Sequence, residues 1–458
     1  MPLNDRSTYR EHLPASPIVF RGSLSPFRDS FSWTRLRQVG ITLSDQVLSV
    51  AGMFLVNVVL ARTQSKYEYG LFALSYSAFT FIMGIHNAAI LETFTVYGSG
   101  RYQKHFLPYL RLIWTSNVLL GVVSTAILTT GWVVLAYTAP AVASRTLLGV
   151  SLACGILLTA TFLRRAFYVR RRPDLAARFS LGFFCSCALL LWIAFRFGLL
   201  DGFSGYIIVA LSWVLAALPL LRELPGALNS REFMEVEPHY WSEHWKYSRW
   251  VLVTACVFQL TTQGYFWLVA GLLSVGDVGN LRALYNMVLP LDQLFVAMSL
   301  VVLPAMCSRY ATYKMAGLLP LWRRYCLGWF AVTAGFVLVV SVFGKSAMHV
   351  LYAGRFDNIS SLVLIVAFLP MILGIGHTVN GALKAAEKPN LIFYAYAFSG
   401  IATFLFGIPL VTHWGLRGAV YGMLVSGITY TIVLLCGLSV LSYRQGRTAS
   451  SAFLHEEG

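Results

Sequence analysis

The chain has 458 residues, of which 57% are hydrophobic and only 12% are charged, and its mean hydropathy is +0.67. A soluble globular protein of this length does not show such values, so the composition predicts a polytopic membrane protein. The formal charge of +16 does not indicate nucleic-acid binding, because the basic residues lie in the loops between apolar runs, where membrane topology requires them.

The start of the chain contains no apolar core and no small-residue cleavage site of the kind that ends a signal peptide. Residues 1–38 are therefore predicted to be a cytoplasmic N-terminal tail. The seven cysteines lie in or at the ends of apolar runs, without paired spacing. This arrangement indicates small apolar core residues and predicts neither a disulfide framework nor a zinc site.

Residues 40–92 hold two apolar runs separated by a short polar segment. Each run is about as long as the roughly 20 residues that a helix needs to cross the hydrocarbon layer, so the pair predicts a transmembrane helical hairpin. Asp45 lies inside the first run, and Ser49 and Gly52 follow it at helical spacing. A charge at this depth costs on the order of 2.5–3.5 kcal/mol. This helix face is therefore expected to look into a protein interior or a wet cavity.

Further apolar runs along the chain predict twelve membrane crossings in total. The crossings lie near residues 40–61, 70–92, 109–137, 146–163, 179–199, 203–221, 250–272, 282–305, 325–350, 359–383, 391–412 and 418–442. Lys and Arg residues concentrate in the loops and tails that lie on the same side of the membrane as the N-terminus. The positive-inside rule therefore predicts that both termini are cytoplasmic.

The longest hydrophilic insertion, residues 222–248, divides the crossings into two sets of six. We interpret it as a cytoplasmic linker between an N-terminal bundle, residues 39–221, and a C-terminal bundle, residues 249–442. Residues 443–458 are predicted to form a cytoplasmic C-terminal tail.

Short matches between the two halves indicate an internal duplication. They align Gly70 with Gly279 at an offset of 209, Pro173 with Pro389 at an offset of 216, and Gly198 with Gly415 at an offset of 217. Each unit has an even number of crossings, so the halves keep the same orientation and are related by an axis along the membrane normal. The predicted fold class is an all-α polytopic membrane protein, with about twelve transmembrane helices in two pseudo-symmetric six-helix bundles around a central cavity.

Cationic side chains occupy matching positions of the two halves. In the tenth crossing, His377, Asn380 and Lys384 fall on one helix face, and the equivalent stretch of the fourth crossing holds Arg164 and Arg165. Such a stripe suits gripping a phosphate or pyrophosphate, because Arg supplies a bidentate fork and Lys a point charge. The alternative is that these residues only obey the positive-inside rule and extend to lipid head groups.

Two carboxylates, Asp45 and Asp292, lie inside apolar runs. Intramembrane carboxylates mark proton or cation pathways, so both are predicted to couple ion movement to transport. Asp292 follows Pro290, whose missing N–H bends a helix and opens its backbone toward a cavity. The alternative is that each carboxylate makes an interhelical hydrogen bond or an ion pair, for example with an Arg.

Uncharged polar patches occur in two further crossings. His86 and Asn87 end the second crossing, and Gln259 and Gln263 share one face of the seventh. Amides bond to hydroxyl groups without demanding a charge, so these patches are predicted to line a sugar path. The alternative is that they hold neighbouring helices together, at about 0.6 kcal/mol per contact.

The sequence lacks the HExxH, GxSxG and Walker A motifs, and it has no GxGxxG motif in a βαβ setting. We therefore predict that the protein is not an enzyme and uses no cofactor.

Several of these segments resemble the polysaccharide flippases of the superfamily that also contains the MATE multidrug exporters and the lipid II flippase. The resemblance rests on SDQVLSVAGMFLVNVVLARTQSKYEYGLFAL near the start, on NGALKAAEKPNL, and on WGLRGAVYGMLVSG near the end, and it covers about residues 38–442. It implies twelve or fourteen helices in two bundles, alternating access, and export of an undecaprenyl-pyrophosphate-linked oligosaccharide. The count of apolar runs favours twelve.

The resemblance also implies a cargo and a setting. The first crossing has Asp45 and Gln46 where the lipid II flippases carry arginines. This difference favours O-antigen, capsule or exopolysaccharide units over a peptidoglycan precursor. The implied location is a bacterial inner membrane. The implied partners are the lipid-linked oligosaccharide, membrane lipids, a coupling ion (proton or sodium) and polysaccharide-assembly proteins, with no role for nucleic acid.

Two other functions stay open at this point. A multidrug antiporter could use Asp45 as its coupling carboxylate, and its drug-cation cavity should be acidic and aromatic rather than basic. An integral membrane glycosyltransferase or polymerase would normally need a larger external loop to hold its acceptor. Glycosidic bond formation by the purified protein would establish the latter.

Overall fold

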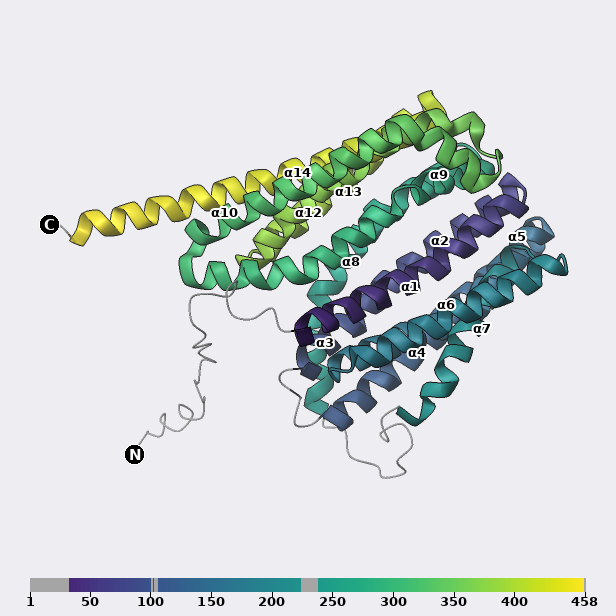
Figure 1. Cartoon of the computed structure of the whole chain (residues 1–458), viewed down its shortest axis with the longest axis horizontal. Coiled ribbons are helices and arrows are strands. Elements are labelled where there is room, and N and C mark those ends of the chain that lie inside the picture. Colours follow the sequence, from purple (N-terminus) through teal and green to yellow (C-terminus); the bar gives the residue numbers. More distant parts are fainter. Residues whose placement is uncertain (1–32, 100–101, 103–105, 224–237, 457–458) are drawn as a thin grey trace, which may run out of the picture. The chain divides into compact units, whose positions relative to one another are not determined.

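The chain folds almost entirely into long helices (Figure 1). The computed structural model describes residues 33–99, 102, 106–223 and 238–456, and none of these residues lies in a β-strand. Residues 41–458 form one compact unit, to which the contacts described below belong. The predicted all-helical fold class is confirmed.

The N-half, as we call the helices up to residue 223, follows the purple-to-teal part of Figure 1. Its elements are α1 (Trp33–Thr63), α2 (Lys66–His86), the π-helix η1 (Asn87–Leu91), α3 (Glu92–Ser99), α4 (Phe106–Thr138), α5 (Ala141–Val169), α6 (Pro173–Arg196), α7 (Gly202–Ala217) and the 3₁₀-helix η2 (Leu218–Glu223).

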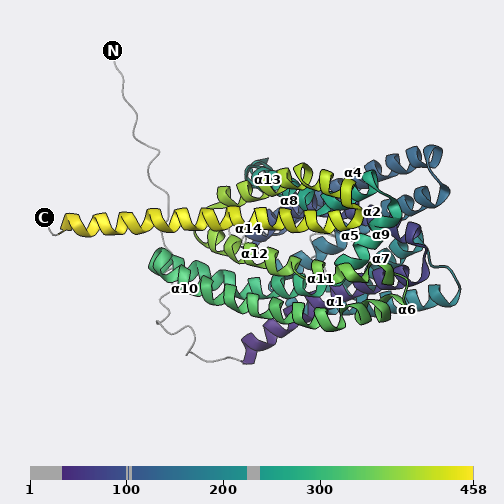
Figure 2. The same cartoon turned by 90° about the horizontal axis from the view of Figure 1, so that it is seen from above.

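The C-half, as we call the helices from residue 238 onward, follows the teal-to-yellow part, and its helices α10, α12, α13 and α14 lie side by side in both views (Figures 1 and 2). Its elements are α8 (Pro238–Leu272), α9 (Val275–Asn286), α10 (Leu289–Tyr352), the 3₁₀-helix η4 (Asp357–Leu362), α11 (Val363–Val366), α12 (Leu369–Ala385), α13 (Pro389–Leu405) and α14 (Gly407–Glu456). The backbone leaves helical geometry at Lys314 inside α10 and at Gly415 inside α14.

Ten helical stretches of the described chain are long and apolar enough to cross a membrane, and α13 is a shorter apolar helix. This number is compatible with the predicted twelve crossings. The predicted eighth and eleventh crossings correspond to the segment of α9 and α10 that precedes Lys314 and to α13.

The helices extend further into the predicted polar segments than the sequence indicated. The linker was expected to reach residue 248, but α8 begins at Pro238, and the C-terminal tail from residue 443 continues α14 to Glu456. Residues 1–32 of the predicted N-terminal tail and residues 224–237 of the linker lie outside the described residues. The two bundle boundaries therefore stay predictions.

The repeats found in the sequence coincide with repeated backbone geometry. Arg171 and Glu387, which precede the aligned prolines, both have a φ of 58°, and the aligned Gly198 and Gly415 have φ values of 64° and 57°. Pro173 and Pro389 then each open a helix, where a missing N–H costs no intrahelical hydrogen bond. Both pairs thus make the same left-handed turn before or within equivalent helices, as the duplication predicts.

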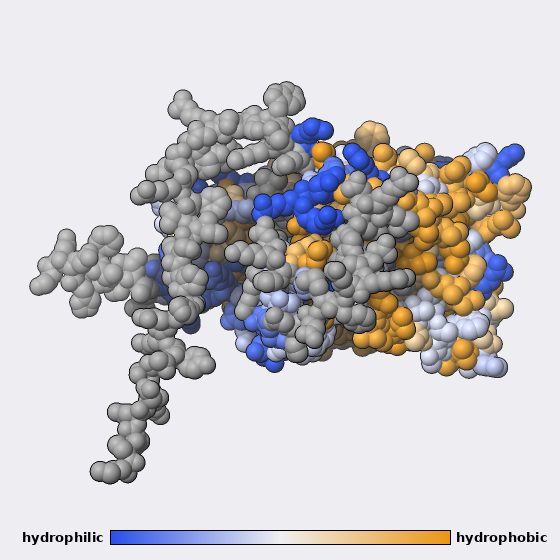
Figure 3. All heavy atoms as spheres, turned by 90° about the horizontal axis from the view of Figure 1, so that it is seen from below, coloured by the Kyte–Doolittle hydropathy of each residue, from blue (hydrophilic) through white to orange (hydrophobic). Residues whose placement is uncertain are grey.

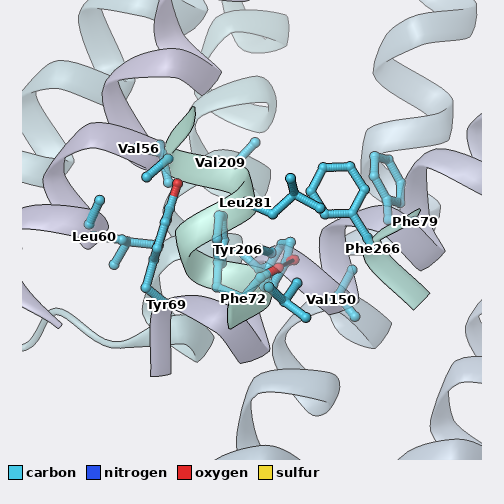
Figure 4. Packing of buried hydrophobic residues seen from close by; sticks show 14 of the residues in the cluster. Val56, Leu60, Tyr69, Phe72, Phe79, Val150, Tyr206, Val209, Phe266 and Leu281 are labelled. Atoms are coloured by element: carbon cyan, nitrogen blue, oxygen red, sulfur yellow. Dashed lines mark hydrogen bonds between the residues drawn. The ribbon is translucent and has the colours of Figure 1, made fainter. Parts of the chain in front are cut away.

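Aromatic side chains fill much of the N-half core (Figure 4). The rings of Phe72 and Tyr206 lie 4.7 Å apart between centroids, and the Tyr206 hydroxyl donates to the carbonyl oxygen of Phe72 at 2.9 Å. Phe266 of α8 and Leu281 of α9 belong to the same cluster. The first two C-half helices are therefore packed into the core of the N-half.

The outer surface of the helices is strongly apolar. Leu119, Val122 and Ile127 on α4 are 63%, 61% and 63% exposed, and Figure 3 shows hydrophobic residues over a broad part of one face. Water would not tolerate an apolar surface of this extent on a monomeric protein. These helices instead require contact with lipid, as expected for a multi-pass membrane protein.

Glycines bring α2 and α9 into close contact. A Cβ atom added to Gly70 would lie 1.8 Å from the carbonyl oxygen of Val275, and one added to Gly279 would lie 2.8 Å from that of Lys66. Because glycine has only a hydrogen as its side chain, these two repeat-related positions allow the backbones of the two halves to come into contact.

We expect Gly70→Ala to weaken this contact. The added methyl group meets backbone, which cannot rotate away, and overpacking of this kind costs about 1–3 kcal/mol. The variant should show a lower thermal unfolding temperature in detergent. Gly328→Ala on α10 is the matched control, because an added Cβ there has no atom within 4 Å. Equal unfolding temperatures for the two variants would contradict the close approach.

Candidate functional site

Two cavities lie on either side of the segment formed by α9 and the start of α10. The first, the N-half cavity, has a volume of about 350 Å³ and is walled by α1, α2, α5, α6 and α7 together with α9 and α10. Its lining includes Asn57, Tyr76, Thr161, Arg164, Arg282 and Gln293.

Arg164 and Asp45 form a buried ion pair at the edge of the N-half cavity. Their side chains approach to 2.7 Å between Nη2 and Oδ2, and Asp45 is fully buried while Arg164 is 16% exposed. Tyr168 also donates to Oδ2 at 2.7 Å, and Ser180 donates to Oδ1. Both carboxylate oxygens are therefore occupied by donors from α5 and α6, and the charge of Asp45 is balanced within the protein.

Arg282 on α9 lies in the same cavity without such a balance. It is 6% exposed, and its Nε donates to the Asn57 amide oxygen at 3.4 Å. Its guanidinium carbon lies 4.6 Å from the ring centroid of Tyr76 and 5.9 Å from that of Phe266. Within the described chain Arg282 forms no ion pair, so its positive charge is the uncompensated one in this cavity.

The second cavity, the C-half cavity, has a volume of about 330 Å³ and is lined by α8, α9, α10, α12, α13 and α14. Its lining contains the rings of Phe258, Tyr265, Tyr285, Phe295, Tyr396 and Tyr430, the hydroxyl groups of Thr261, Thr262, Ser399 and Ser426, and the side chains of Asp292 and His377. Among these described lining residues there is no Lys or Arg. The two cavities thus differ in the sign of their charge.

Asp292 is the carboxylate of the C-half cavity. Its Oδ2 accepts a hydrogen bond from Tyr285 at 3.1 Å. His377 stands across the same lining, with its ring centroid 5.2 Å from that of Phe295 and its Nδ1 3.3 Å from the Tyr430 hydroxyl. The sequence placed Asp292 and His377 in different hypothetical roles, and the fold brings them into one cavity.

A break in the eighth crossing gives the two cavities their shared wall. α9 ends at Asn286 and α10 begins at Leu289, with Pro290 in its first turn. The helix is therefore interrupted just before Pro290, where the sequence predicted a bend. Neighbouring residues then point to opposite sides, because Asp292 lines the C-half cavity and Gln293 lines the N-half cavity.

Other predicted site residues lie outside both cavities. Arg165 donates to the Asn87 amide oxygen at 3.4 Å, which ties α5 to the π-helix that interrupts the second crossing. His86 is fully buried, with its Nε2 2.7 Å from the amide oxygen of Asn117 on α4. These contacts join helices of the N-half to one another.

The remaining predicted residues are Asn380, Gln259, Gln263 and Lys384, and their surroundings differ. Asn380 donates to the hydroxyl groups of Tyr396 and Tyr430 at 3.2 and 2.9 Å. Gln259 is buried against Gly84 of α2, the side-chain oxygen of Gln263 is buried without a hydrogen bond, and Lys384 is exposed. The transport roles predicted for these residues stay predictions.

Sequence reasoning missed Arg282. The eighth crossing was expected to start at residue 282, which placed this arginine at the membrane surface, where a cation is ordinary. α9 in fact begins at Val275, so Arg282 lies two helical turns inside. The Ser274 hydroxyl accepts from the backbone N–H of Asp277, and this Ser-x-x-Asp cap was the signal in the sequence for the earlier start.

No protein-family model and no curated protein matches this chain. Solved structures do. An inward-facing multidrug resistance MATE family transporter of the MOP superfamily superposes with a TM-score of 0.72 at 12% identity, over 88% of this chain and 99% of that one. The chain has the MATE transporter fold.

Two further structures share this MATE fold. The lipid II flippase MurJ, in an inward closed conformation, gives a TM-score of 0.68 at 14% identity, over 88% of this chain and 87% of that one. A MOP superfamily transporter from Pyrococcus furiosus gives 0.63 at 11% identity, over 88% and 95%. At these identities the likeness establishes the architecture alone.

We expect the Asp45–Arg164 pair to behave as a structural unit of this fold. Asp45→Asn or Arg164→Gln alone leaves one buried charge unpaired, which costs about 3–5 kcal/mol. The double variant removes both charges and should unfold at a higher temperature than either single variant. Thermal unfolding of the four proteins in detergent measures the coupling, and additive effects of the two substitutions would contradict it.

Proposed function

We propose that this protein is a transporter that carries a polyprenyl-pyrophosphate-linked oligosaccharide across the membrane by alternating access. The cargo is a repeat unit of O-antigen, capsule or exopolysaccharide, and the membrane is the bacterial inner membrane. The observation that carries the proposal is Arg282, a buried cation in the N-half cavity that has no anionic partner in the described chain.

The surroundings of Arg282 support an anionic cargo. Burying a guanidinium costs several kcal/mol unless anions or hydrogen-bond acceptors compensate. The rings of Tyr76 and Phe266 and the amide of Asn57 supply part of this compensation. A pyrophosphate would supply the rest, because the planar fork of Arg matches two phosphate oxygens.

Arg164 is the second cation of the N-half cavity in this proposal. Its ion pair with Asp45 balances its charge, but its side chain keeps 16% exposure and lines the same space. It can therefore offer a further N–H to a phosphate without leaving Asp45. The lipid tail of the cargo would remain in the bilayer between the two halves while the head group occupies the cavities.

Contacts between the halves support alternating access. At the turn between α1 and α2, Arg62 donates from Nε to the carbonyl oxygen of Leu351 at 2.7 Å and from Nη2 to that of Val350, near the end of α10. Arg355 returns a bond to the carbonyl oxygen of Arg62 at 2.6 Å. Each arginine thus caps the carboxyl end of the other half's helix, where carbonyl groups lack helical partners.

These arginine caps lie at the end of the bundle that the charge distribution assigns to the outside. The hydrogen bonds of Arg62 and Arg355 are exposed, so water can compete for each of them. Breaking these bonds therefore costs little free energy. We therefore propose that they form an outer gate, which separates when the cavity opens outward.

Arg282→Ala should weaken binding of a prenyl pyrophosphate. A hydrogen bond to a charged group contributes about 1.5–3 kcal/mol, so the loss should be roughly tenfold or more in Kd. Farnesyl pyrophosphate binding to the purified protein, measured by calorimetry, tests this. Farnesol is the uncharged control ligand, and Arg145→Ala, with its side chain 66% exposed, is the control variant. Equal affinity of wild type and Arg282→Ala would refute the anion site.

Removing both arginines of the outer gate should shift the protein toward the outward-open state. The background for this measurement is a variant in which the exposed Cys185, Cys307 and Cys436 are replaced by Ser. Spin labels attached to cysteines introduced at Tyr67 and Ser361 then report the separation of the halves at this end. We expect Arg62→Ala with Arg355→Ala to add a longer-distance population in double electron–electron resonance. An unchanged distance distribution would contradict the gate, and Arg145→Ala is the matched control.

A second candidate function is export of organic cations. The observation that favours it is the C-half cavity, which combines Asp292 with six aromatic rings from five helices and holds no Lys or Arg among its described lining residues. Aromatic faces and a carboxylate are the groups that bind organic cations. Efflux of such cations that persists in Arg282→Ala would favour this function over the first.

A further inference from the structure

The carboxylate of Asp292 stands in the C-half cavity without a cationic partner. Tyr285 donates to its Oδ2, and no Lys, Arg or His within the described chain forms an ion pair with it. The start of α10 favours a negative charge nearby. That contribution is far smaller than the penalty for withdrawing a carboxylate from water. The cavity therefore lacks a positive charge.

Two tyrosine rings that line the same cavity as Asp292 are held in a fixed arrangement. Tyr396 and Tyr430 stack with centroids 4.9 Å apart at an interplanar angle of 20°. Asn380 donates to both of their hydroxyl groups, which fixes the two rings in place. The face of an aromatic ring carries partial negative charge and attracts ammonium groups, most strongly where water is excluded.

The wall also suits a ligand that carries hydroxyl groups. The hydroxyl of Ser399 donates to the carbonyl oxygen of Ser426 at 2.9 Å, and that of Thr262 donates to Phe258 at 3.1 Å. A hydroxyl that donates in this way keeps lone pairs that can accept from a ligand. A purely apolar cation would leave these acceptors unused, whereas a sugar would fill them.

The two cavities flank the eighth crossing and contain charges of opposite sign. Arg282 lines the N-half cavity and Asp292 lines the C-half cavity. The two charged residues lie on the two helices that flank the junction between α9 and α10. One ligand with an anionic end and a cationic end can therefore satisfy both.

We propose that the C-half cavity is a binding site for a protonated amine on the head group of the cargo. The lipid-linked cargo then carries an amino sugar, whose ammonium group sits at Asp292 while its phosphates sit at Arg282. The amine site stands on the C-half cavity alone, and only its assignment to the glycan of a pyrophosphate lipid rests on the proposed function.

Binding of two matched disaccharides to the purified protein tests this proposal. The first is the disaccharide of β-1,4-linked glucosamine, with free amines that are protonated at the working pH, and the second is its N-acetylated form. Wild-type protein should bind the free amine about tenfold or more tightly than the acetylated form, because a charged hydrogen bond is lost on acetylation. Equal affinities would overturn the proposal.

Asp292→Asn should abolish the preference for the free amine. Asp174→Asn, which removes the same charge from an exposed ion pair with Arg172 and lines neither cavity, should leave the preference intact. Thermal unfolding shows whether each variant is folded, and Asp292→Glu, which keeps the charge, should retain most of the preference. A preference that survives in a folded Asp292→Asn variant would overturn the site.

A third ligand shows whether the site binds the ammonium group of an amino sugar or that of an organic cation. If benzyltrimethylammonium binds in an Asp292-dependent manner and neither disaccharide binds, the sugar assignment fails and the site belongs to an organic-cation exporter. Farnesyl pyrophosphate binding to wild type and Arg282→Ala tests the proposed function separately. An amine preference without Arg282-dependent pyrophosphate binding would keep the site and remove its lipid-linked cargo.

Discussion

An ionised side chain inside the hydrocarbon layer must be paired, hydrated or bound to a ligand, because the bilayer offers no other compensation. Under this constraint the buried charges of the protein fall into two groups, those paired within the protein and those without a partner. Asp45 is saturated by Arg164, Tyr168 and Ser180, and it ties α1 to α5 and α6. Arg282 and Asp292 have no such partners in the described chain, so they are the groups left available for a cargo.

The segment formed by α9 and the start of α10 presents these two charges to different cavities. Arg282 on α9 lines the N-half cavity, and Asp292 in the first turn of α10 lines the C-half cavity. The same segment packs through Gly279 against α2. Movement of the two halves would therefore act directly on the wall that holds both charges.

The sequence analysis distinguished a flippase from a drug exporter by the charge of the central cavity, and the structure has two cavities with different charges. A basic vestibule was predicted for a flippase and an acidic, aromatic one for a drug exporter. The N-half cavity matches the first through Arg282 and the C-half cavity matches the second through Asp292. A cargo that carries both signs of charge removes the contradiction, which neither a simple anion nor a simple cation does.

The sequence by itself determined the helical membrane fold, the alignment of Pro173 with Pro389, and the interruption before Pro290, because hydropathy runs and prolines act over a few residues. It could not pair Asp45 with Arg164, 119 positions away. It also could not show that Arg165 bonds to Asn87 of η1 or that Lys384 is exposed. Only the tertiary structure decided which charges are neutralised and which face a cavity, since a charge pair depends on contacts between helices that are distant in the chain.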